Sequence, residues 1–246
     1  MLTVDLNCDL GEGCENDAEL MRYISSANVA CGFHAGDEAT MRKTVELAIE
    51  NNVAVGAHPG YRDKENFGRQ PMPISGREVF DIVVEQIELL NEICVSLGTS
   101  LHHVKPHGAL YNQAARDQEL AAAIAEAVIR ADKNLILYGL SGSYLISEAA
   151  SAGLRTASEV FADRTYQSDG SLTPRTEPNA LIADAKDSVQ QVLQMIKSQS
   201  VATVEGEPVA IHADTVCIHG DGSHATEFAI TLRQELEKNG IAIQAV

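Results

Sequence analysis

The sequence predicts an α/β protein in which seven parallel strands close into a TIM-like (β/α) barrel. Short β-like runs alternate with helical patterns along all 246 residues, and strand–helix units in series imply parallel strands joined by right-handed crossovers. The length is close to the roughly 250 residues typical of such a barrel. Ionisable residues follow nearly every expected strand, whereas the alternative, an open doubly wound sheet, gathers its chemistry at one switch point.

The expected strands are short apolar runs that recur along the chain. They cover residues 2–6, 27–31, 53–57, 101–104, 134–138, 158–162 and 215–219. No linker, low-complexity tract or internal repeat interrupts this order, so we expect a single barrel domain spanning residues 1–246.

The clearest expected helix covers residues 75–97. Ser75 and Glu78 form a capping-box pair at its start, and Gly98 follows its end. Its apolar residues step by three and four, which places them in one stripe along a helix. They are Val79, Val83, Ile87, Leu90, Cys94 and Leu97.

A second helix is expected over residues 178–197, with Pro178 in the first turn, where a missing N–H costs nothing. The run "VATVEGEPVAI" (201–211) predicts a hairpin that turns at residues 205–208, outside the main sheet. Further helices are expected at 37–51, 116–131, 143–152 and 222–239.

The charge and composition argue against several classes of protein. The formal net charge is −17, from 35 acidic and 18 basic residues, and such a surface repels nucleic-acid backbones and anionic lipids. The N-terminal sequence is not that of a signal peptide, and no apolar run is long enough to span a membrane. Five cysteines without a CxxC pair indicate a reducing compartment, which is the cytoplasm.

Polar residues gather where the expected strands end, and the loops that follow barrel strands share one face. His34, His58, His107 and His219 each lie within two residues of a Gly or Pro. Lys105 and His58 precede prolines, which favours extended backbone that directs these side chains out of the strand. The candidate catalytic residues are Asp9, Glu12, His34, Asp37, His58, His107, Asp163, His219 and Asp221, and the candidate substrate-binding residues are Lys105 and Arg164.

This set of residues leaves two chemistries open. Asp9, His34 and His58 could hold a divalent metal that lowers the pKa of a bound water. Alternatively, the same groups act as acids and bases while Lys105 and Arg164 hold an anionic substrate. Asp37 also has a purely structural interpretation as the N-cap of the helix expected at 37–51. The phosphate-binding pattern GxxxxGK[ST] does not occur in the sequence.

Seven motifs in order resemble those of the LamB/YcsF family. They are "DLNCDLGE", "NVACGFHAGD", "GAHPGYRD", "VKPHGALYN", "EVFADRTY", "GSLTPR" and "CIHGD", and they extend from about Val4 to Asp221. The resemblance implies a barrel akin to the glycoside hydrolase/deacetylase superfamily. It also implies the A subunit of an ATP-dependent 5-oxoprolinase, a hydrolase that works with subunits B and C and opens the cyclic amide 5-oxo-L-proline to L-glutamate.

With this reaction as the hypothesis, each candidate residue receives an expected role. Lys105 and Arg164 bind the substrate carboxylate or the transferring phosphoryl group, and Asp9 or Glu12 orients or deprotonates the attacking water. His34, His58, His107 and His219 polarise the carbonyl or move protons, oriented by Asp37, Asp163 and Asp221. ATP is the co-substrate of the complex, and the sequence leaves open whether a metal is bound. The alternatives are a stand-alone metal-dependent deacetylase of amides or carbohydrates and a non-catalytic, substrate-binding subunit.

Overall fold

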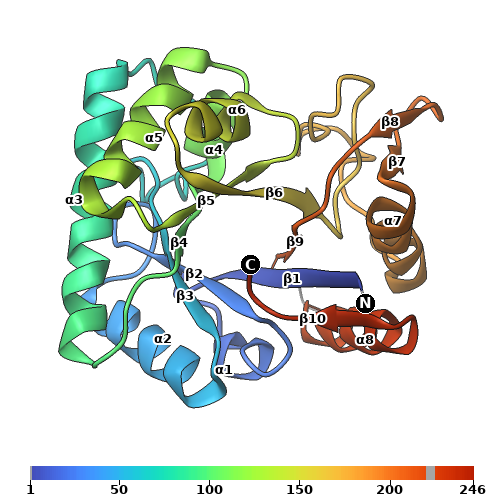
Figure 1. The fold of residues 1–246 in the computed structure, drawn as a ribbon, viewed down its shortest axis with the longest axis horizontal. Coiled ribbons are helices and arrows are strands. Elements are labelled where there is room, and N and C mark those ends of the chain that lie inside the picture. The colour runs from blue at the N-terminus through green and yellow to red at the C-terminus, as the bar shows by residue number, and fades with distance from the viewer. Residues whose placement is uncertain (1, 220–224) are drawn as a thin grey trace.

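Seven parallel strands close into a barrel, as the sequence predicts. The computed structural model describes residues 2–219 and 225–246 (Figure 1). Within these residues, each barrel strand pairs in parallel with the next, and pairing of the first with the last closes the ring. The barrel strands are β1 (Leu2–Leu10), β2 (Ser26–Ala30), β3 (Ala54–His58), β4 (His103–Val104), β5 (Ile136–Leu140), β6 (Arg155–Phe161) and β9 (Thr215–Ile218). A further short strand, β10 (Ile241–Ile243), pairs with the beginning of β1.

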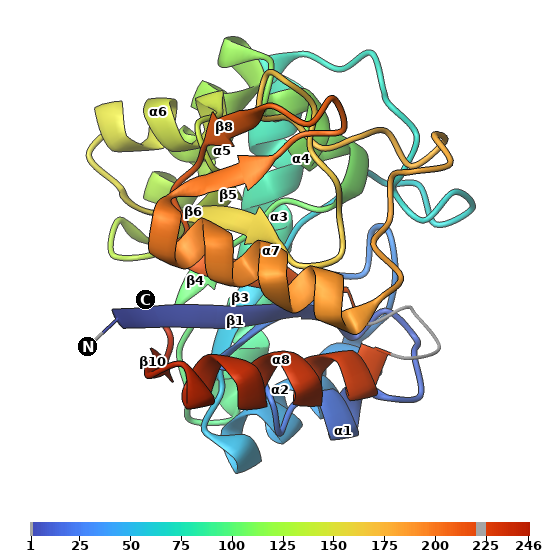
Figure 2. The same ribbon diagram turned by 90° about the vertical axis from the view of Figure 1, so that its right-hand side faces the viewer.

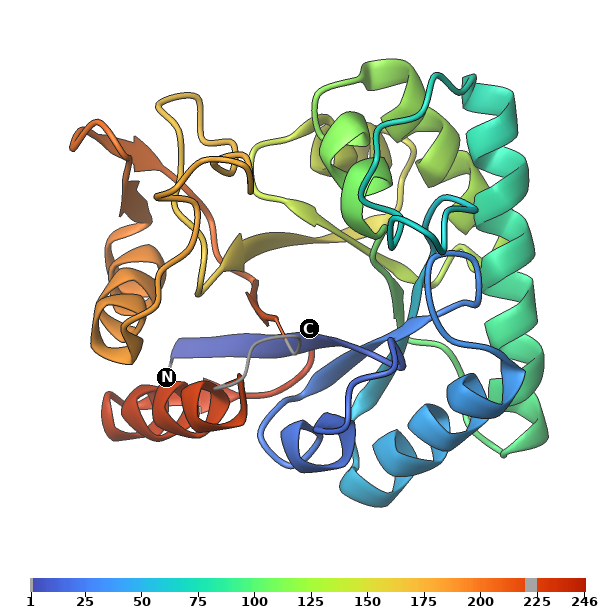
Figure 3. The same ribbon diagram turned by 180° about the vertical axis from the view of Figure 1, so that it is seen from behind.

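Helices surround the barrel and cover its outer face. They are α1 (Asp17–Leu20), α2 (Glu38–Asn51), α3 (Gly76–Ser96), α4 (Gly108–Ala114), α5 (Gln118–Asp132), α6 (Tyr144–Ser151), α7 (Ala185–Ser198) and α8 (Ala225–Lys238). The long helix α3 runs along one side of the molecule. Figure 3 shows this arrangement with the whole molecule viewed from behind. On the opposite side α7 and α8 lie next to each other (Figure 2).

Helix α3 forms where its sequence pattern predicts it. The Ser75 side chain accepts from the backbone N–H of Glu78 while the Glu78 side chain accepts from that of Ser75, so both halves of the capping box are present. Its stripe of apolar residues, including Val79, Val83 and Ile87, is buried in the main hydrophobic cluster. Because burial of that stripe removes apolar area from water, it attaches the helix to the barrel wall.

The expected helix at 178–197 begins later than predicted. Helix α7 starts at Ala185, where the Asp184 side chain accepts from the backbone N–H groups of Lys186 and Asp187. The preceding residues are instead held by the loop after β6, because Ile182 N–H donates to the Asp163 carbonyl at 2.9 Å. Pro178 therefore lies outside the helix in an exposed segment.

Some elements differ from the pattern-based expectation in extent or were not expected. The short helices α1 and α4 and the strand β10 have too few residues to show a clear period.

At 201–211, β7 (Ser200–Ala202) and β8 (Pro208–Ala210) pair as a separate two-stranded antiparallel sheet. None of the helices in the described residues is long and apolar enough to cross a bilayer.

The interior of the barrel contains a network of buried polar side chains. Side chains alternate between the two faces of a strand, so Asp5, Asn7 and Asp9 of β1 share one face. Asp5 Oδ2 accepts from Thr215 Oγ1 at 2.6 Å, and Asn7 Nδ2 donates to Thr215 Oγ1 at 2.7 Å and to Glu159 Oε1 at 3.0 Å. Asn28 Nδ2 extends this network by donating to Asn7 Oδ1 and to Asp9 Oδ1 at 2.8 Å each, so that it reaches Asp9 near the carboxyl end of β1.

Candidate active site

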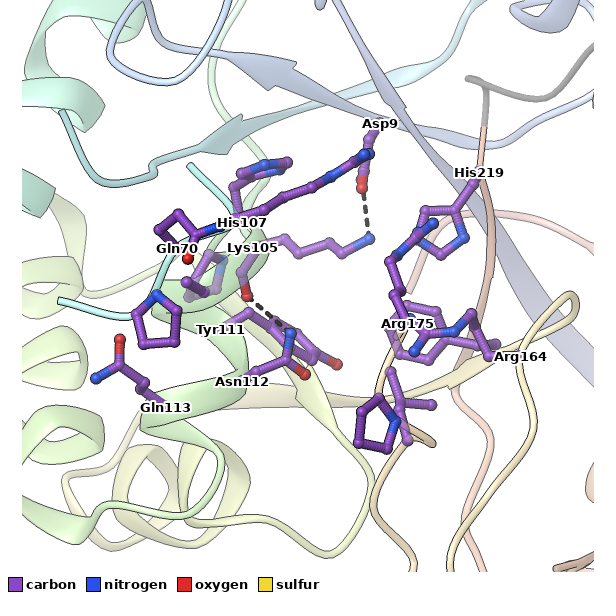
Figure 4. A pocket seen from close by; sticks show the side chains of 18 of the residues that line it. Asp9, Gln70, Lys105, His107, Tyr111, Asn112, Gln113, Arg164, Arg175 and His219 are labelled. Atoms are coloured by element: carbon purple, nitrogen blue, oxygen red, sulfur yellow. Dashed lines mark hydrogen bonds and ion pairs between the residues drawn. The ribbon is translucent and has the colours of Figure 1, made fainter. Parts of the chain in front are cut away.

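A cavity of about 780 Å³ opens at the carboxyl ends of the barrel strands (Figure 4). Its volume lies within the range of small-molecule sites. The end of β1 and the loops after β3, β4, β6 and β9 contribute to its lining, as the barrel topology requires. Of the residues singled out in the sequence, the cavity is lined by Asp9, Glu12, His58, Lys105, His107, Arg164 and His219.

Lys105 occupies the inner end of this cavity and is almost completely buried. Its Nζ lies 2.8 Å from Asp9 Oδ1 and 2.9 Å from Glu159 Oε1, and it donates to Asn7 Oδ1 at 3.2 Å. Burial alone lowers the pKa of Lys105, but neighbouring negative charge, led by Asp9, holds that pKa well above its usual value. Lys105 is therefore a cation whose charge is balanced by two carboxylates.

Asp9 connects this lysine to a group of histidines. Asn28 Nδ2 donates to Asp9 Oδ1 at 2.8 Å, and Asp9 Oδ2 lies 3.3 Å from His58 Nε2. Burial raises the pKa of Asp9, but His58 and then Lys105 outweigh it and hold that pKa well below the usual range. Asp9 is thus an ionised carboxylate at the cavity, with a side chain that is 10% exposed.

Glu12, His34, His58 and His107 form a compact cluster beside Asp9. Their candidate ligand atoms all lie within 4.8 Å of one another. The rings of His34 and His107 stack at 3.8 Å between centroids, with 5° between their planes. Burial followed by the nearby His58 lowers the pKa of His34 to about 2 and that of His107 well below the usual value. The Asp9 carboxylate instead outweighs the effect of burial at His58 and raises its pKa.

The structure changes the metal set expected from the sequence. His34 and His58 group with Glu12 and His107, whereas Asp9 forms a second group with Cys217 and His219. Imidazole and carboxylate ligands are the donors that a zinc-class ion uses. His34 does not line the cavity, because Gly60 and Gly68 pack against its ring and side chain.

Asp163 and His219 form a pair at the opposite side of the cavity. His219 Nδ1 lies 2.7 Å from Asp163 Oδ2, and the His219 ring stacks on Phe161 at 5.6 Å between centroids. Burial raises the pKa of Asp163, but His219 overcomes this and lowers it. The carboxylate thereby orients an imidazole that is 14% exposed and faces the cavity.

Positive charge is concentrated around the cavity of this acidic protein. Five of the 18 Lys and Arg residues line it: they are Arg69, Lys105, Arg116, Arg164 and Arg175. Arg164 and Arg175 lie on the same side as His219 (Figure 4). Arg164 is buried and donates to the carbonyls of Thr173 at 2.6 Å and Ala180 at 3.3 Å. Burial, followed by the charge of Arg175, lowers the pKa of Arg164 to about 10. A cationic cavity in a protein of net charge −17 favours small anions.

Asp37 is expected in the site, but the described structure does not bring it there. Asp37 is exposed, and its side chain accepts from the backbone N–H and the hydroxyl of Thr40 at 2.8 Å each, so it caps α2. The capping interpretation is correct for Asp37, because Asp is well suited to accept from the first-turn N–H groups of a helix. Asp221 lies outside the described residues.

Sequence reasoning missed Glu159, the second carboxylate that faces Lys105. Its side chain is 0% exposed, and it lies in the middle of β6 rather than after its end. An acidic residue within an otherwise apolar strand run, "SEVFA", is the signal that could have identified it. Tyr111 was likewise given no role, although burial, followed by the charge of Glu159, raises its pKa well above the usual value.

Comparison with known proteins gives a consistent result along the whole chain. Residues 4–246 match the family model described as the LamB/YcsF family. The A subunit of 5-oxoprolinase from Shouchella clausii is 57% identical over 100% of this chain and 99% of that protein. A solved structure, the lactam utilization protein from Thermus thermophilus, superposes with a TM-score of 0.94 at 42% identity and covers 100% of both chains.

A more distant structure agrees in fold alone. The family 4 carbohydrate esterase from Streptomyces lividans superposes with a TM-score of 0.56 at 10% identity, covering 99% of this chain and 92% of that one. The deacetylase-like barrel expected from the sequence is thereby confirmed as a fold.

Proposed function

The chain belongs to the LamB/YcsF family, and on that premise we propose that it is the A subunit of a 5-oxoprolinase. In this reaction 5-oxo-L-proline, ATP and two waters give L-glutamate, ADP and phosphate. The observation that carries the proposal is full-length identity above 50% to proteins named as that subunit. We further propose that subunits B and C complete the enzyme, and that it works in the cytoplasm, where ATP is available and buried thiols such as Cys8 and Cys31 stay reduced.

The chemistry explains why ATP is needed. A five-membered lactam is a resonance-stabilised amide, and its carbonyl carbon is a poor electrophile. Transfer of the γ-phosphoryl group to the lactam oxygen releases ADP and gives an activated imidate. One water then adds to the ring carbon and the C–N bond breaks, leaving an amine and an acyl phosphate. A second water releases phosphate and leaves the carboxylate of glutamate.

The cavity contains groups suited to the steps after activation. Asp9 is ionised and lies at the cavity, so we assign it the role of orienting and deprotonating the attacking water, with Glu12 beside it. The imidazole of His219, held by Asp163, faces the same space and is placed to protonate the departing ring nitrogen. The remaining histidines are His58 and His107, which line the cavity beside Asp9 and Glu12, and His34, which lies in the same cluster away from the cavity. We assign this cluster the role of polarising this end of the cavity.

The arginines are better placed than Lys105 to hold the anionic parts of the substrate. The charge of Lys105 is balanced by Asp9 and Glu159, so we propose that it chiefly fixes Asp9 and keeps it ionised. Arg164 and Arg175 face the cavity from the loop after β6 and are candidates for the substrate carboxylate or a phosphoryl group. Such a division separates the water-activating end of the cavity from its anion-binding end.

The site of phosphorylation is proposed to lie with the partner subunits. The sequence lacks the familiar phosphate loop. The cationic cavity is suited to bind an activated, anionic intermediate as well as 5-oxoproline itself. One observation favours a second candidate function: the Glu12–His34–His58–His107 cluster suits a metal-dependent deacetylase. A non-catalytic, substrate-binding subunit is the remaining alternative.

Co-expression with candidate B and C subunits provides the test. Glutamate release from 5-oxoproline is measured with and without ATP, using the wild-type chain and the variant Asp9→Asn. We expect release only with ATP and the complete complex, and a loss of kcat of at least about 10²-fold for Asp9→Asn, the lower end of what a general base contributes. Turnover of Asp9→Asn within a few-fold of wild type refutes its role, and ATP-independent release of acetate from an acetylated amide supports the deacetylase.

A further inference from the structure

We propose that Glu12, His58 and His107 form a binding site for one zinc-class divalent cation, with His34 as a positioning residue. The inference concerns the isolated chain and holds whether or not the proposed lactam reaction is correct. It rests on the hydrogen bonds that fix the two imidazole rings and on the spacing of the three atoms that remain.

Backbone carbonyls determine which nitrogen of each ring carries hydrogen. His58 Nδ1 lies 2.7 Å from the Lys105 carbonyl oxygen, and His107 Nε2 lies 2.9 Å from that of Phe67. A carbonyl oxygen only accepts, so both of these nitrogens are donors. In the neutral rings this leaves lone pairs on His58 Nε2 and His107 Nδ1. These two atoms lie 2.9 Å apart, and Asp9 Oδ2 also lies 3.3 Å from His58 Nε2. Two facing lone pairs at that distance repel each other unless a positive charge lies beside or between them.

A carboxylate completes the group of acceptor atoms. Glu12 Oε1 lies 3.3 Å from His107 Nδ1 and 3.8 Å from His58 Nε2. A tetrahedral zinc ion with ligands at about 2.0–2.1 Å separates neighbouring ligand atoms by roughly 3.3–3.4 Å. The three observed separations of 2.9, 3.3 and 3.8 Å lie around that value. Two imidazoles and one carboxylate are also the donor set of zinc and its first-row neighbours, rather than of magnesium or calcium.

The surroundings resemble the outer shell of a metal site. Ligating histidines typically donate their second N–H to a carbonyl or carboxylate, which orients the ring, and His58 and His107 both do so. His34 Nε2 lies 3.2 Å from Glu12 Oε1, and its buried Nδ1 has no hydrogen-bond partner within the described structure. The hydrogen of His34 therefore belongs on Nε2, where it is donated to Glu12 and holds that carboxylate in place.

Access and competition favour this cluster over its neighbour. Glu12, His58 and His107 all line the open cavity, so a cation can enter from solvent. The second candidate group contains Asp9 and Cys217, and the ammonium of Lys105 already lies 2.8 Å from Asp9 Oδ1 and 3.1 Å from Cys217 Sγ. A metal there would have to displace this buried ammonium, which is bonded to that group rather than to the three proposed ligands. A proton shared between the two rings is the competing occupant of the proposed site.

Metal binding by the purified full-length chain tests the proposal without any assay of turnover. The chain is stripped with a chelator and titrated with Zn²⁺ by calorimetry, and with Co²⁺ while the visible absorption is recorded. We expect one equivalent of Zn²⁺ per chain and a Co²⁺ spectrum of low coordination number. His107→Gln should weaken Zn²⁺ binding at least 100-fold, and His34→Gln about 10- to 100-fold, as for a group that orients a ligand.

The control variant is His212→Gln, because His212 is an exposed histidine that pairs with Asp214 at 3.0 Å and lies outside the cavity. It should bind Zn²⁺ as wild type does. Glu12→Gln keeps the shape of its side chain and serves as the second ligand variant if His107→Gln does not fold by circular dichroism. Equal Zn²⁺ affinity in wild type and in the folded ligand variant, or no binding to wild type, overturns the proposal and leaves the proton as the occupant.

Discussion

Lys105 Nζ lies 2.8 Å from Asp9 Oδ1, and this contact links the end of β1 to the residue that follows β4. The same ammonium lies 2.9 Å from Glu159 Oε1 of β6. One buried cation thus joins three strands of the barrel at the inner end of the cavity. Because each of its partners is also nearly buried, the triad carries consequences for stability as well as for chemistry.

Replacement of Lys105 by Met should destabilise the protein strongly. It leaves Asp9 and Glu159 buried without their cation, and removal of one partner from a buried ion pair typically costs about 3–5 kcal/mol. Urea denaturation at neutral pH measures the free energy of unfolding. The double variant Lys105→Met/Glu159→Gln should recover part of the loss, since one unpaired charge is removed. A loss below about 1 kcal/mol for the single variant would contradict the buried triad.

Asp37→Ala should separate a capping role from a catalytic one. The exposed carboxylate accepts from the N–H and hydroxyl of Thr40, and these hydrogen bonds lower the pKa of Asp37. We expect a measurably lower thermal midpoint, with kcat of the assembled enzyme within about twofold of wild type. Asp37→Asn, which keeps a capping oxygen, should restore most of the midpoint. A loss of kcat like that of Asp9→Asn would return Asp37 to the site.

Arg175→Gln should weaken substrate binding rather than slow the chemical step. A hydrogen bond to a charged group contributes about 1.5–3 kcal/mol, so the KM for the anionic substrate should rise roughly 10- to 100-fold with little change in kcat. The matched control is Arg62→Gln, because Arg62 is exposed and pairs with Glu85 away from the cavity. Steady-state kinetics of the assembled enzyme measure both constants. An unchanged KM for Arg175→Gln would exclude it from the anion-binding end.

Asp5→Asn should change how stability depends on pH. Burial raises the pKa of Asp5 above its usual value of 3.8, despite hydrogen bonds from Ser25, Thr215 and Ser26 that act in the opposite direction. The folded wild-type protein therefore holds this proton more tightly than the unfolded chain does, and its stability falls as pH rises from about 3.8 through the raised pKa. The Asp5→Asn variant does not undergo this fall in stability.

The difference in unfolding free energy between Asp5→Asn and wild type should accordingly shift in favour of the variant as pH rises, and then level off. Chemical denaturation between pH 4 and 8 measures it. Glu78→Gln is the contrasting control, because hydrogen bonds to Ser75 lower the pKa of that exposed carboxyl. Its stabilising contribution is present above the usual pKa and is lost as pH falls, so its difference should change in the opposite direction.

Gly56→Ala should disrupt the interior of the barrel. A Cβ at this position overlaps the ring of His103, which stacks on Tyr138 at 4.1 Å between centroids and lies 2.8 Å from Asn28 Oδ1. The ring cannot move without losing these contacts, so we expect a loss of about 1–3 kcal/mol or more in unfolding free energy. Gly76→Ala is the control, because its new methyl group meets the flexible side chain of Glu119. Equal stability of both variants would contradict the tight packing at Gly56.

Local sequence patterns were sufficient for the strands, for most helices and for placing several candidate residues at the cavity end of the barrel. The strand runs and the capping box at Ser75 depend on neighbours a few residues away, so they can be read without a structure. The predicted start of α7 at Pro178 was wrong, because the Ile182 N–H donates to the Asp163 carbonyl. The sequence pattern after Pro178 cannot reveal this contact. Asp37 fitted two interpretations equally, and its exposure together with its hydrogen bonds from Thr40 decided between them.

The sequence by itself determined the α/β barrel and the family. It also determined that Asp9, His58 and Lys105 lie at the ends of strands. Only the tertiary structure decided that Glu159 faces Lys105, that Glu12 joins His58 and His107, and which ring nitrogens remain free. The physical reason is that strand pattern is a property of adjacent residues, whereas these contacts join residues that lie 40 or more positions apart. The closure of the barrel and the register of its strands fix such distances, and neither can be predicted from a short segment of the sequence.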